Sequence, residues 1–325
     1  MFLKLVPDNT NVQFTRMRFA AMILSALMIV GSIVALYTKG LNFGIDFLGG
    51  ITIEIADSEP IDEAAVRTTV GALDVGNFNV QTIRDFAGTA PAVVIFVERQ
   101  QAEEGNEDAE RAAEIAQQEA QRKVLDAMRE LLGDDIDVRK VDVVGPTVSG
   151  ELIQKGVTAV ILAVAMMLLY IWFRFEWQFS IGAVLALVHD VVITLGMFAV
   201  TQLKFELAII AALLTIVGYS MNDTVVVYDR VRENLRKYKK KPLAELLDIS
   251  INDTLSRTVM TSVTTLLALS ALVIFGGVVL RGFTLAMIWG ILIGTYSSIF
   301  VASPLLLATG VKRDWSQNTA AAATP

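Results

Sequence analysis

The chain has 325 residues, of which 54% are hydrophobic and 19% charged, and its mean hydropathy of +0.55 indicates a membrane protein. It has no cysteine and one histidine, His189, which excludes structural disulfides and the usual zinc sites. No glycine-rich loop ends in Gly-Lys-Ser or Gly-Lys-Thr, which argues against an ATP-driven transporter, and the net charge of −7 argues against a nucleic-acid partner. We therefore expect no cofactor and no metal ion.

Six apolar stretches approach or exceed the roughly 20 residues that cross a bilayer core of about 30 Å. They are 19–37, 156–173, 179–200, 207–227, 258–280 and 283–307. The first follows Arg16 and Arg18 and lacks a small-residue cleavage site, so we expect a retained signal-anchor helix. The sequence thus predicts six transmembrane helices, a 38–155 domain between the first two, a 228–257 loop between the fourth and fifth, and tails at 1–18 and 308–325.

Basic residues near the helix ends predict the orientation, because positively charged flanks stay in the cytoplasm. With both termini in the cytoplasm, fourteen such residues lie on the cytoplasmic side and four, Lys39, Lys155, Lys204 and Arg281, on the other. The segment 38–155, with 23 acidic and 11 basic residues, then lies outside the cytoplasm.

Within 38–155 the hydrophobic period alternates between that of strands and that of helices. We expect strands at about 43–55, 78–86, 92–99 and 136–144, a first helix beginning near Pro60, and a second helix from about Ile115 to Leu132. The polar residues 100–110 are expected to form a solvated extension or loop. The order βαββαβ predicts a ferredoxin-like α+β domain, with both helices on one face of an antiparallel sheet.

Inserting a charged side chain into the centre of a bilayer costs at least about 2.5–3.5 kcal/mol, so each such residue needs a partner or a function. His189 and Asp190 lie in the middle of the third predicted helix, Asp223 lies beside Asn222 near the cytoplasmic end of the fourth, and Arg257 begins the fifth. Asp223 and Arg257 therefore share a depth.

A carboxylate in apolar surroundings holds a proton more readily, and a nearby guanidinium opposes this. The pair Asp223 and Arg257 is thus the minimum needed for a proton relay, with Asn222, His189 and Asp190 as further candidates. A static buried pair that fixes helix packing is the alternative for Asp223. The same alternative stands for His189 and Asp190.

Residues at the two connections between the membrane and the 38–155 domain are expected to couple the two parts. Asp46, Gly49 and Gly50 follow the first helix, and Gly145 and Pro146 precede the second. The glycines would shape the turn into the first strand. An acid such as Asp46 at a membrane exit normally has a backbone or basic partner.

Six motifs taken together resemble those of the SecF family, the partner of SecD in bacterial protein export. They are FGIDFLGG at 43–50, VVGPTVSGEL at 143–152, HDVVITLG at 189–196, GYSMNDTVVVYDRVREN at 218–234, LSRTVMTSVTTLLAL at 255–269 and GTYSSIFVASPLLL at 294–307. The resemblance implies half of an RND-type 12-helix bundle, with the other six helices supplied by SecD, in the bacterial inner membrane. It also implies use of the proton motive force to promote preprotein translocation, with the proton-passage aspartate and arginine falling on Asp223 and Arg257.

The partners implied by the resemblance are SecD, the SecYEG channel, SecA, YajC, the unfolded preprotein and membrane lipids. Three other functions remain open. A small-molecule or lipid exporter of the RND superfamily would usually carry both halves in one chain, a structural subunit that stabilises SecD would need no ionisable Asp223, and an intramembrane protease would need motifs that this sequence lacks. We therefore expect a transport subunit and not an enzyme.

Overall fold

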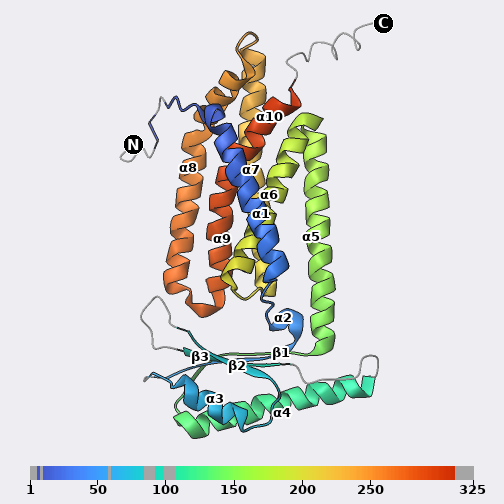
Figure 1. Cartoon of the computed structure of the whole chain (residues 1–325), viewed down its shortest axis with the longest axis vertical. Helices are drawn as coiled ribbons and strands as arrows, with labels where there is room; N and C mark the ends of the chain where they lie inside the picture. Colours follow the sequence, from blue (N-terminus) through green and yellow to red (C-terminus); the bar gives the residue numbers. More distant parts are fainter. Residues whose placement is uncertain (1–5, 8–9, 58–59, 84–91, 99–106, 312–325) are drawn as a thin grey trace.

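The computed structural model describes residues 6–7, 10–57, 60–83, 92–98 and 107–311. The chain folds into a bundle of long helices and a small sheet domain at one end of it (Figure 1). Among the described residues, six helices are long and apolar enough to cross a membrane: Phe14–Thr38, Gly150–Arg174, Trp177–Thr201, Leu207–Lys237, Leu243–Phe275 and Leu280–Thr309. Five of the six predicted apolar stretches lie within these spans. The exception is 258–280, which extends beyond Phe275, the last residue of its helix.

In the described part of the bundle there are six long helices, a short 3₁₀ turn before the first of them, and a π-turn and a short helix after the last. Their bounds are η1 Phe14–Met17, α1 Arg18–Thr38, α5 Pro146–Arg174, α6 Trp177–Thr201, α7 Leu207–Lys237, α8 Leu243–Phe275, α9 Gly277–Ser297, η2 Ser298–Ala302 and α10 Ser303–Thr309. The last three follow one another without a break, so α9, η2 and α10 form a single span.

The predicted loop 228–257 is mostly helical, because α7 and α8 extend beyond their apolar lengths and are joined by polar contacts. Arg230 Nε donates to Asp253 Oδ2 at 2.9 Å, and Asn234 Nδ2 donates to Ser250 Oγ at 3.0 Å. These pairs stabilise a polar helical hairpin, whereas the prediction was based only on the length of the apolar stretch.

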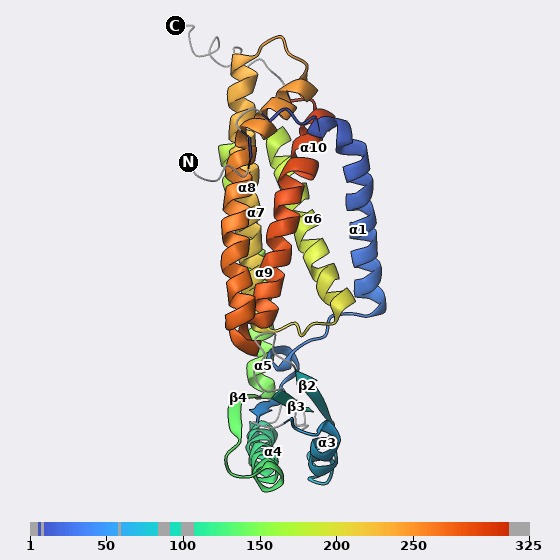
Figure 2. The ribbon, with the colours of Figure 1, turned by 90° about the vertical axis from the view of Figure 1, so that its left-hand side faces the viewer.

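Small residues let the helices of the bundle approach closely. A Cβ atom at Gly290 would overlap Ile216, and one at Gly294 would lie 2.9 Å from the Ser220 Cβ atom. These two glycines therefore bring α9 against α7. Figure 2 shows α1 packed along α6 at the side of the bundle.

The sheet domain has the predicted βαββαβ order. Its elements are β1 Gly50–Ala56, α3 Glu63–Gly71, β2 Phe78–Ile83, β3 Ala92–Glu98, α4 Glu107–Leu132 and β4 Asp137–Val144. The strands lie in the order β2-β3-β1-β4 with antiparallel neighbours. Both helices cover the face of the sheet that points away from the bundle (Figures 1 and 2), as the ferredoxin-like fold requires.

Alternation along β1 explains why the sheet has two different faces. Ile51, Ile53 and Ile55 are buried in the core beneath α3 and α4. The intervening residues Thr52 and Glu54 line a hollow that is shared with residues from the ends of the membrane helices. The face of the sheet that α3 and α4 leave uncovered therefore faces the bundle of this same chain.

Two boundaries in the domain differ from the prediction. The expected first strand, 43–55, contains a one-turn helix, α2 Ile45–Leu48. Gly49, at φ +72°, separates this helix from β1, whose first residue, Gly50, has φ +130°. The second helix starts at Glu107, eight residues before its amphipathic part. Residues 84–86 and 99 of the predicted strands, the polar residues 100–106 and the tail 312–325 lie outside the described residues.

Candidate functional site

Asp190 joins three membrane helices through its carboxylate. It lies in α6 and is only 1% exposed. Its Oδ2 atom accepts hydrogen bonds from Ser220 Oγ of α7 at 2.5 Å and from Ser297 Oγ of α9 at 2.7 Å. Its Oδ1 atom lies 2.9 Å from Nδ1 of His189. Both oxygens are thus satisfied inside the bundle, as a buried carboxyl group requires.

His189 connects this carboxylate to the first membrane helix through Tyr296. The imidazole is 3% exposed and stacks on the Tyr296 ring, with centroids 6.0 Å apart and an interplanar angle of 25°. The Tyr296 hydroxyl donates to the Ala21 carbonyl of α1 at 2.8 Å and lies 3.0 Å from Ser25 Oγ. Nε2 of His189 has no hydrogen-bond partner in the described part of the chain.

Asp223 forms a second hydroxyl-bound carboxylate in α7. Its Oδ1 atom accepts from Thr258 Oγ1 of α8 at 2.5 Å, and its Oδ2 atom accepts from Ser298 Oγ at 2.5 Å. Because Ser297 binds Asp190 and Ser298 binds Asp223, two neighbouring residues of one helix connect the two carboxylates.

A π-turn places these two serines. The helix widens at Ser298–Ala302, where Ser303 Oγ donates to the Ser298 carbonyl at 2.8 Å. Pro304 follows, and its missing N–H leaves a carbonyl of the preceding turn without its α-helical partner. Such π-turns occur often at functional sites because they reorient side chains.

The predicted partner Arg257 does not form an ion pair with Asp223 in the described residues. The Arg257 side chain is exposed on the outside of the bundle, whereas Thr258, the next residue, is 2% exposed and binds Asp223. Successive helical residues point about 100° apart, so only one of the two can face α7. Arg257 lies at the level of Asp223, and Asn222 is likewise exposed.

Two apolar clusters enclose the carboxylates from both ends of the bundle. The cluster nearer the sheet domain includes Phe198, Phe205, Ile209, Ile216 and Ile291. The cluster at the other end includes Phe179, Tyr228, Val231, Leu235 and Leu246. Between these clusters His189 and Asp190 are buried, whereas Asp223 is partly exposed.

The segment after α1 is attached to the α6–α7 connection. Asp46 Oδ2 accepts from the backbone N–H of Leu207, the first residue of α7, at 2.7 Å. The backbones of Gly44 and Phe205 are joined by a 2.9 Å bond, and Asn42 Nδ2 donates to the Gln202 carbonyl at 2.8 Å. The partner expected for Asp46 is thus the N-terminus of α7, the helix that carries Asp223.

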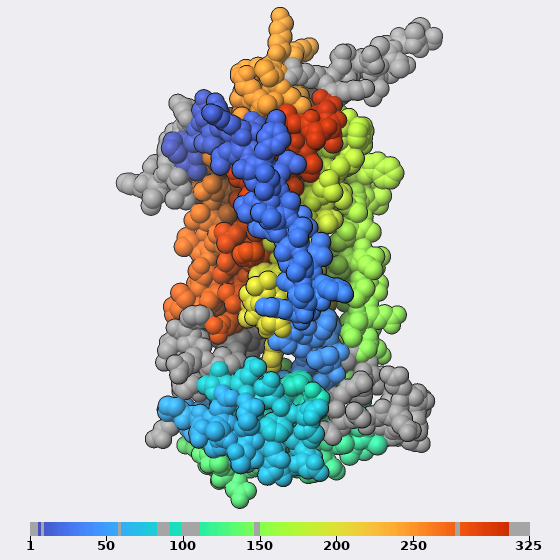
Figure 3. Space-filling view, viewed as in Figure 1, coloured from blue at the N-terminus to red at the C-terminus, as the bar shows by residue number. Residues whose placement is uncertain are grey.

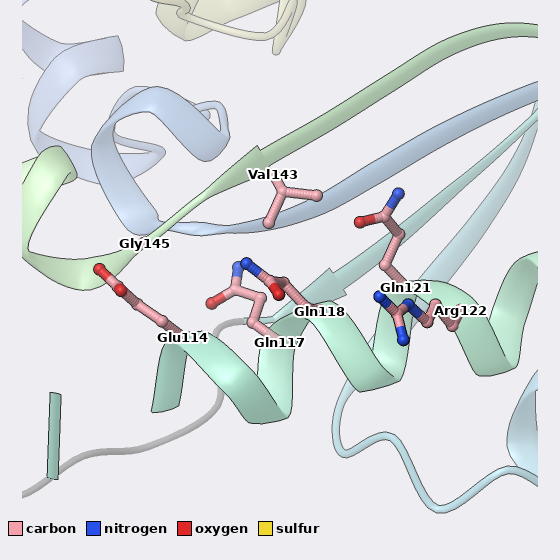
Figure 4. A pocket seen from close by; sticks show the side chains of 7 residues that line it. All are labelled: Glu114, Gln117, Gln118, Gln121, Arg122, Val143 and Gly145. Carbon is pink, nitrogen blue, oxygen red and sulfur yellow. The ribbon is translucent and has the colours of Figure 1, made fainter. Parts of the chain in front are cut away.

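The second connection runs directly from β4 into α5, where Gly145 caps the helix and Pro146 is its first residue. Gly145 lies at the end of a hollow of about 460 Å³ between α4 and β4 (Figure 4). Gln117 Nε2 donates there to the Val144 carbonyl at 3.1 Å. This bond joins α4 to the strand end that leads into the membrane.

The sequence did not reveal Ser297, Ser298 and Thr258 as partners of the carboxylates. Ser298 follows Gly290 and Gly294 at a spacing of four residues, a pattern that is typical of close helix packing. The sequence does contain a signal for Ser297 and Ser298: two adjacent serines lie in an apolar stretch, seven and six residues before Pro304. Their hydroxyls need internal partners at membrane depth.

Family models match two parts of the chain. Residues 123–312 match "Protein export membrane protein SecD/SecF, C-terminal", and residues 34–56 match the "SecD/SecF GG Motif". The second match covers the segment that holds the N-terminus of α7.

Curated relatives and solved structures agree with these matches. Protein translocase subunit SecF of Rhodobacter capsulatus is 46% identical over 96% of this chain and 93% of its own length, and that of Vibrio alginolyticus is 40% identical over 97% and 94%. The crystal structure of SecDF from Thermus thermophilus has a TM-score of 0.76 and 34% identity over 93% of this chain, which spans 39% of that longer protein. The chain belongs to the SecF family of protein translocase subunits.

Proposed function

We propose that this multi-pass membrane protein uses the proton motive force to promote preprotein translocation and release across the bacterial inner membrane. Both termini then lie in the cytoplasm and the sheet domain in the periplasm, in keeping with the distribution of basic residues. The protein acts as a transport subunit, catalyses no covalent reaction and needs no cofactor other than the proton gradient.

The observation that carries this proposal is the pair of carboxylates linked by Ser297 and Ser298, of which Asp190 is buried and Asp223 is partly buried. Each carboxyl group is bound by hydroxyls from neighbouring helices. A hydroxyl both donates and accepts, so it stabilises a carboxylate and a protonated carboxyl group alike. A carboxyl group with a purely structural role would need hydrogen bonds suited to only one protonation state.

Each serine has a second acceptor that makes such a reversal possible. Ser297 Oγ lies 3.1 Å from the Gly294 carbonyl, and Ser298 Oγ lies 3.1 Å from the Thr295 carbonyl. When Asp223 gains a proton, the Ser298 hydroxyl turns to the Thr295 carbonyl and accepts a hydrogen bond from the carboxyl group. The Asp223 carboxyl group and the Ser298 hydroxyl keep hydrogen-bond partners in either state, so both protonation states are compatible with the closed bundle.

Movement would reach the periplasmic domain by two connections. Asp46 holds the N-terminus of α7, and β4 continues through Gly145 into α5. A shift of α7 on protonation of Asp223 therefore displaces the segment that leads into β1. Gly49 and Gly50, with their positive φ angles, give this segment its turn between α2 and β1.

SecD is the partner that would complete the bundle. The SecDF proteins of Brucella abortus and Thermus thermophilus match this chain over 39% of their own lengths. Here α1, α5 and α8 expose large apolar side chains, including Leu27, Met166 and Leu267. Arg257, exposed on α8, would meet a group of SecD. SecYEG, SecA, YajC, membrane lipids and the unfolded preprotein complete the set of proposed partners.

The test is the rate of release of a secreted protein into the periplasm in cells whose only copy carries Asp223→Asn. We expect slower release at unchanged membrane abundance and SecD association. Asp229→Asn, six residues along α7 and in a half-exposed pair with Arg174, is the matched control and should leave release unchanged. Normal release with Asp223→Asn would contradict proton coupling at this residue and favour a structural subunit.

A further inference from the structure

A polar hollow separates the sheet from the ends of the membrane helices. Its volume is about 600 Å³, and it lies on the open face of the sheet, between the two bodies seen in Figure 3. Its charged lining comes from both bodies: Glu54 and Lys140 from the sheet, Lys204 and Glu206 from the α6–α7 connection, and Arg281 from α9. We call it the junction cavity.

Glu206 is the residue immediately before α7, and it is packed against the segment that follows α1. A Cβ atom at Gly44 would lie 2.7 Å from the Glu206 Cγ atom, so only glycine leaves room for this side chain. The next residue, Leu207, is the one whose N–H is held by Asp46. Glu206 therefore lies where the periplasmic domain contacts the helix of Asp223.

Charges of both signs surround Glu206. Lys140 and Lys204 attract its carboxylate, whereas Asp46 and Asp142 repel it. Lys140 and Asp142 also form an ion pair with each other at 2.5 Å. Glu54 of β1 and Arg281 of α9 line the same cavity and have interactions of their own. Attraction and repulsion therefore both act on the Glu206 carboxylate.

We propose that Glu206 is a proton-binding residue of the junction cavity, and that its protonation holds the periplasmic domain docked on the α6–α7 end of the bundle. This proton site lies outside the membrane-spanning helices. It is separate from Asp190 and Asp223, because the apolar cluster around Phe205, Ile209 and Ile216 lies between them and the cavity. Protons from the periplasm would thus bind at Glu206 in addition to the proposed relay in the membrane.

The direction of the effect follows from linkage. Burial, with a contribution from Asp46 and Asp142, raises the pKa of Glu206 above its usual value, although Lys140 and Lys204 oppose the shift. In an undocked domain Glu206 would be solvated and would regain an ordinary pKa. The docked form therefore binds the proton more tightly, so falling pH favours docking, and docking weakens as pH rises through the raised pKa.

The absence of cysteine in the chain allows a direct test by site-specific spin labelling. Labels at Thr52→Cys in β1 and Gly282→Cys in α9 lie on opposite walls of the cavity. Their separation is measured in the complex with a cysteine-free SecD, in vesicles without a proton gradient, between about pH 5 and pH 8. We expect a short distance at low pH and a population with a longer distance as the pH rises.

Three variants decide the assignment. Glu206→Gln, which mimics the protonated form, should keep the short distance at every pH. Glu176→Gln is the matched control, since Glu176 precedes α6 as Glu206 precedes α7, and it should keep the pH response. Lys204→Met removes a cation that opposes protonation and should move the midpoint to higher pH.

A wild-type distance that is constant over this pH range, or a Glu206→Gln protein that responds like the wild type, would overturn the proposal. The measurement needs neither translocation nor a proton gradient. A failure here is therefore distinguishable from a failure of the Asp223 relay, which is tested by release of a secreted protein.

Discussion

Ser297 and Ser298 are adjacent in the chain, yet their hydroxyls bind carboxylates on two different helices. Ser297 donates to Asp190 of α6 at 2.7 Å, and Ser298 donates to Asp223 of α7 at 2.5 Å. Ser297 is the last residue of α9 and Ser298 the first of the π-turn, so the two side chains point in different directions. The two candidate proton sites are thus parts of one network.

The first prediction concerns Ser298→Ala. The change removes one of the two hydroxyls that bind Asp223, and loss of a hydrogen bond to a charged group costs about 1.5–3 kcal/mol. A hydrogen bond to the charged carboxylate is stronger than one to the neutral carboxyl group, so the loss weighs more on the ionised form, and we expect release of a secreted protein to slow by about tenfold or more. Ser256→Ala, at an exposed position on α8, is the control. Equal rates for the two variants at equal abundance would show that the Ser298 bond is dispensable.

The second prediction concerns Tyr296→Phe, which keeps the ring stacked on His189 but removes the hydroxyl that reaches Ala21 and Ser25 of α1. Loss of a neutral hydrogen bond costs about 0.5–1.5 kcal/mol. We expect the apparent midpoint of thermal unfolding in detergent to fall. Tyr170→Phe, on the exposed face of α5, should leave it unchanged. A variant as stable as the wild type would mean that the bond between α1 and α9 contributes nothing.

Hydropathy and charge predicted the helix count, the βαββαβ order and the buried positions of His189 and Asp190. They did not predict the partners of these groups, because Ser297 and Asp190 are 107 residues apart and come together only through packing. For the same reason, depth alone suggested an ion pair between Asp223 and Arg257. The structure places Thr258, not Arg257, on the inner face of α8.

The attachment of the sheet domain to the bundle was predicted only in part. The sequence indicated that Asp46 needs a partner but not that the partner is the first N–H of α7. The alternation of apolar and polar residues predicted a strand that includes Asp46. In the structure the backbones of Asn42 and Gly44 are instead hydrogen-bonded to Phe205, and α2 follows them. The residues around Asp46 carry no information about the α6–α7 connection, because it lies about 160 residues later in the chain.

The third prediction concerns Gly196→Ala, which should destabilise the contact between α1 and α6. A Cβ atom at Gly196 would overlap both the side chain and the Cα atom of Ser32. Overpacking of this kind typically costs about 1–3 kcal/mol. Gly31→Ala is the control, because a Cβ atom there meets nothing within 4 Å and alanine favours the helix. We expect the midpoint of thermal unfolding to fall for Gly196→Ala and to stay the same or rise for Gly31→Ala. Equal midpoints for the two variants would contradict the close packing of α1 and α6.

The fourth prediction separates the hydrogen-bonding role of Asp46 from its charge. Asp46→Ala removes the acceptor for the Leu207 N–H, and loss of such a helix cap costs about 0.5–2 kcal/mol. Asp46→Asn keeps an acceptor oxygen at the same place. We therefore expect Asp46→Ala to speed amide hydrogen exchange in the first turn of α7 and to slow release of a secreted protein, and Asp46→Asn to remain close to the wild type in both.

The control for Asp46→Ala is Asp126→Ala, which removes a carboxylate from an exposed pair on α4 and should change neither measurement. If Asp46→Asn were as defective as Asp46→Ala, the negative charge at the positive end of α7 would matter more than the bond to Leu207. If neither variant altered exchange or release, the attachment at Asp46 would not transmit movement, and the coupling would have to run through β4 and Gly145 into α5.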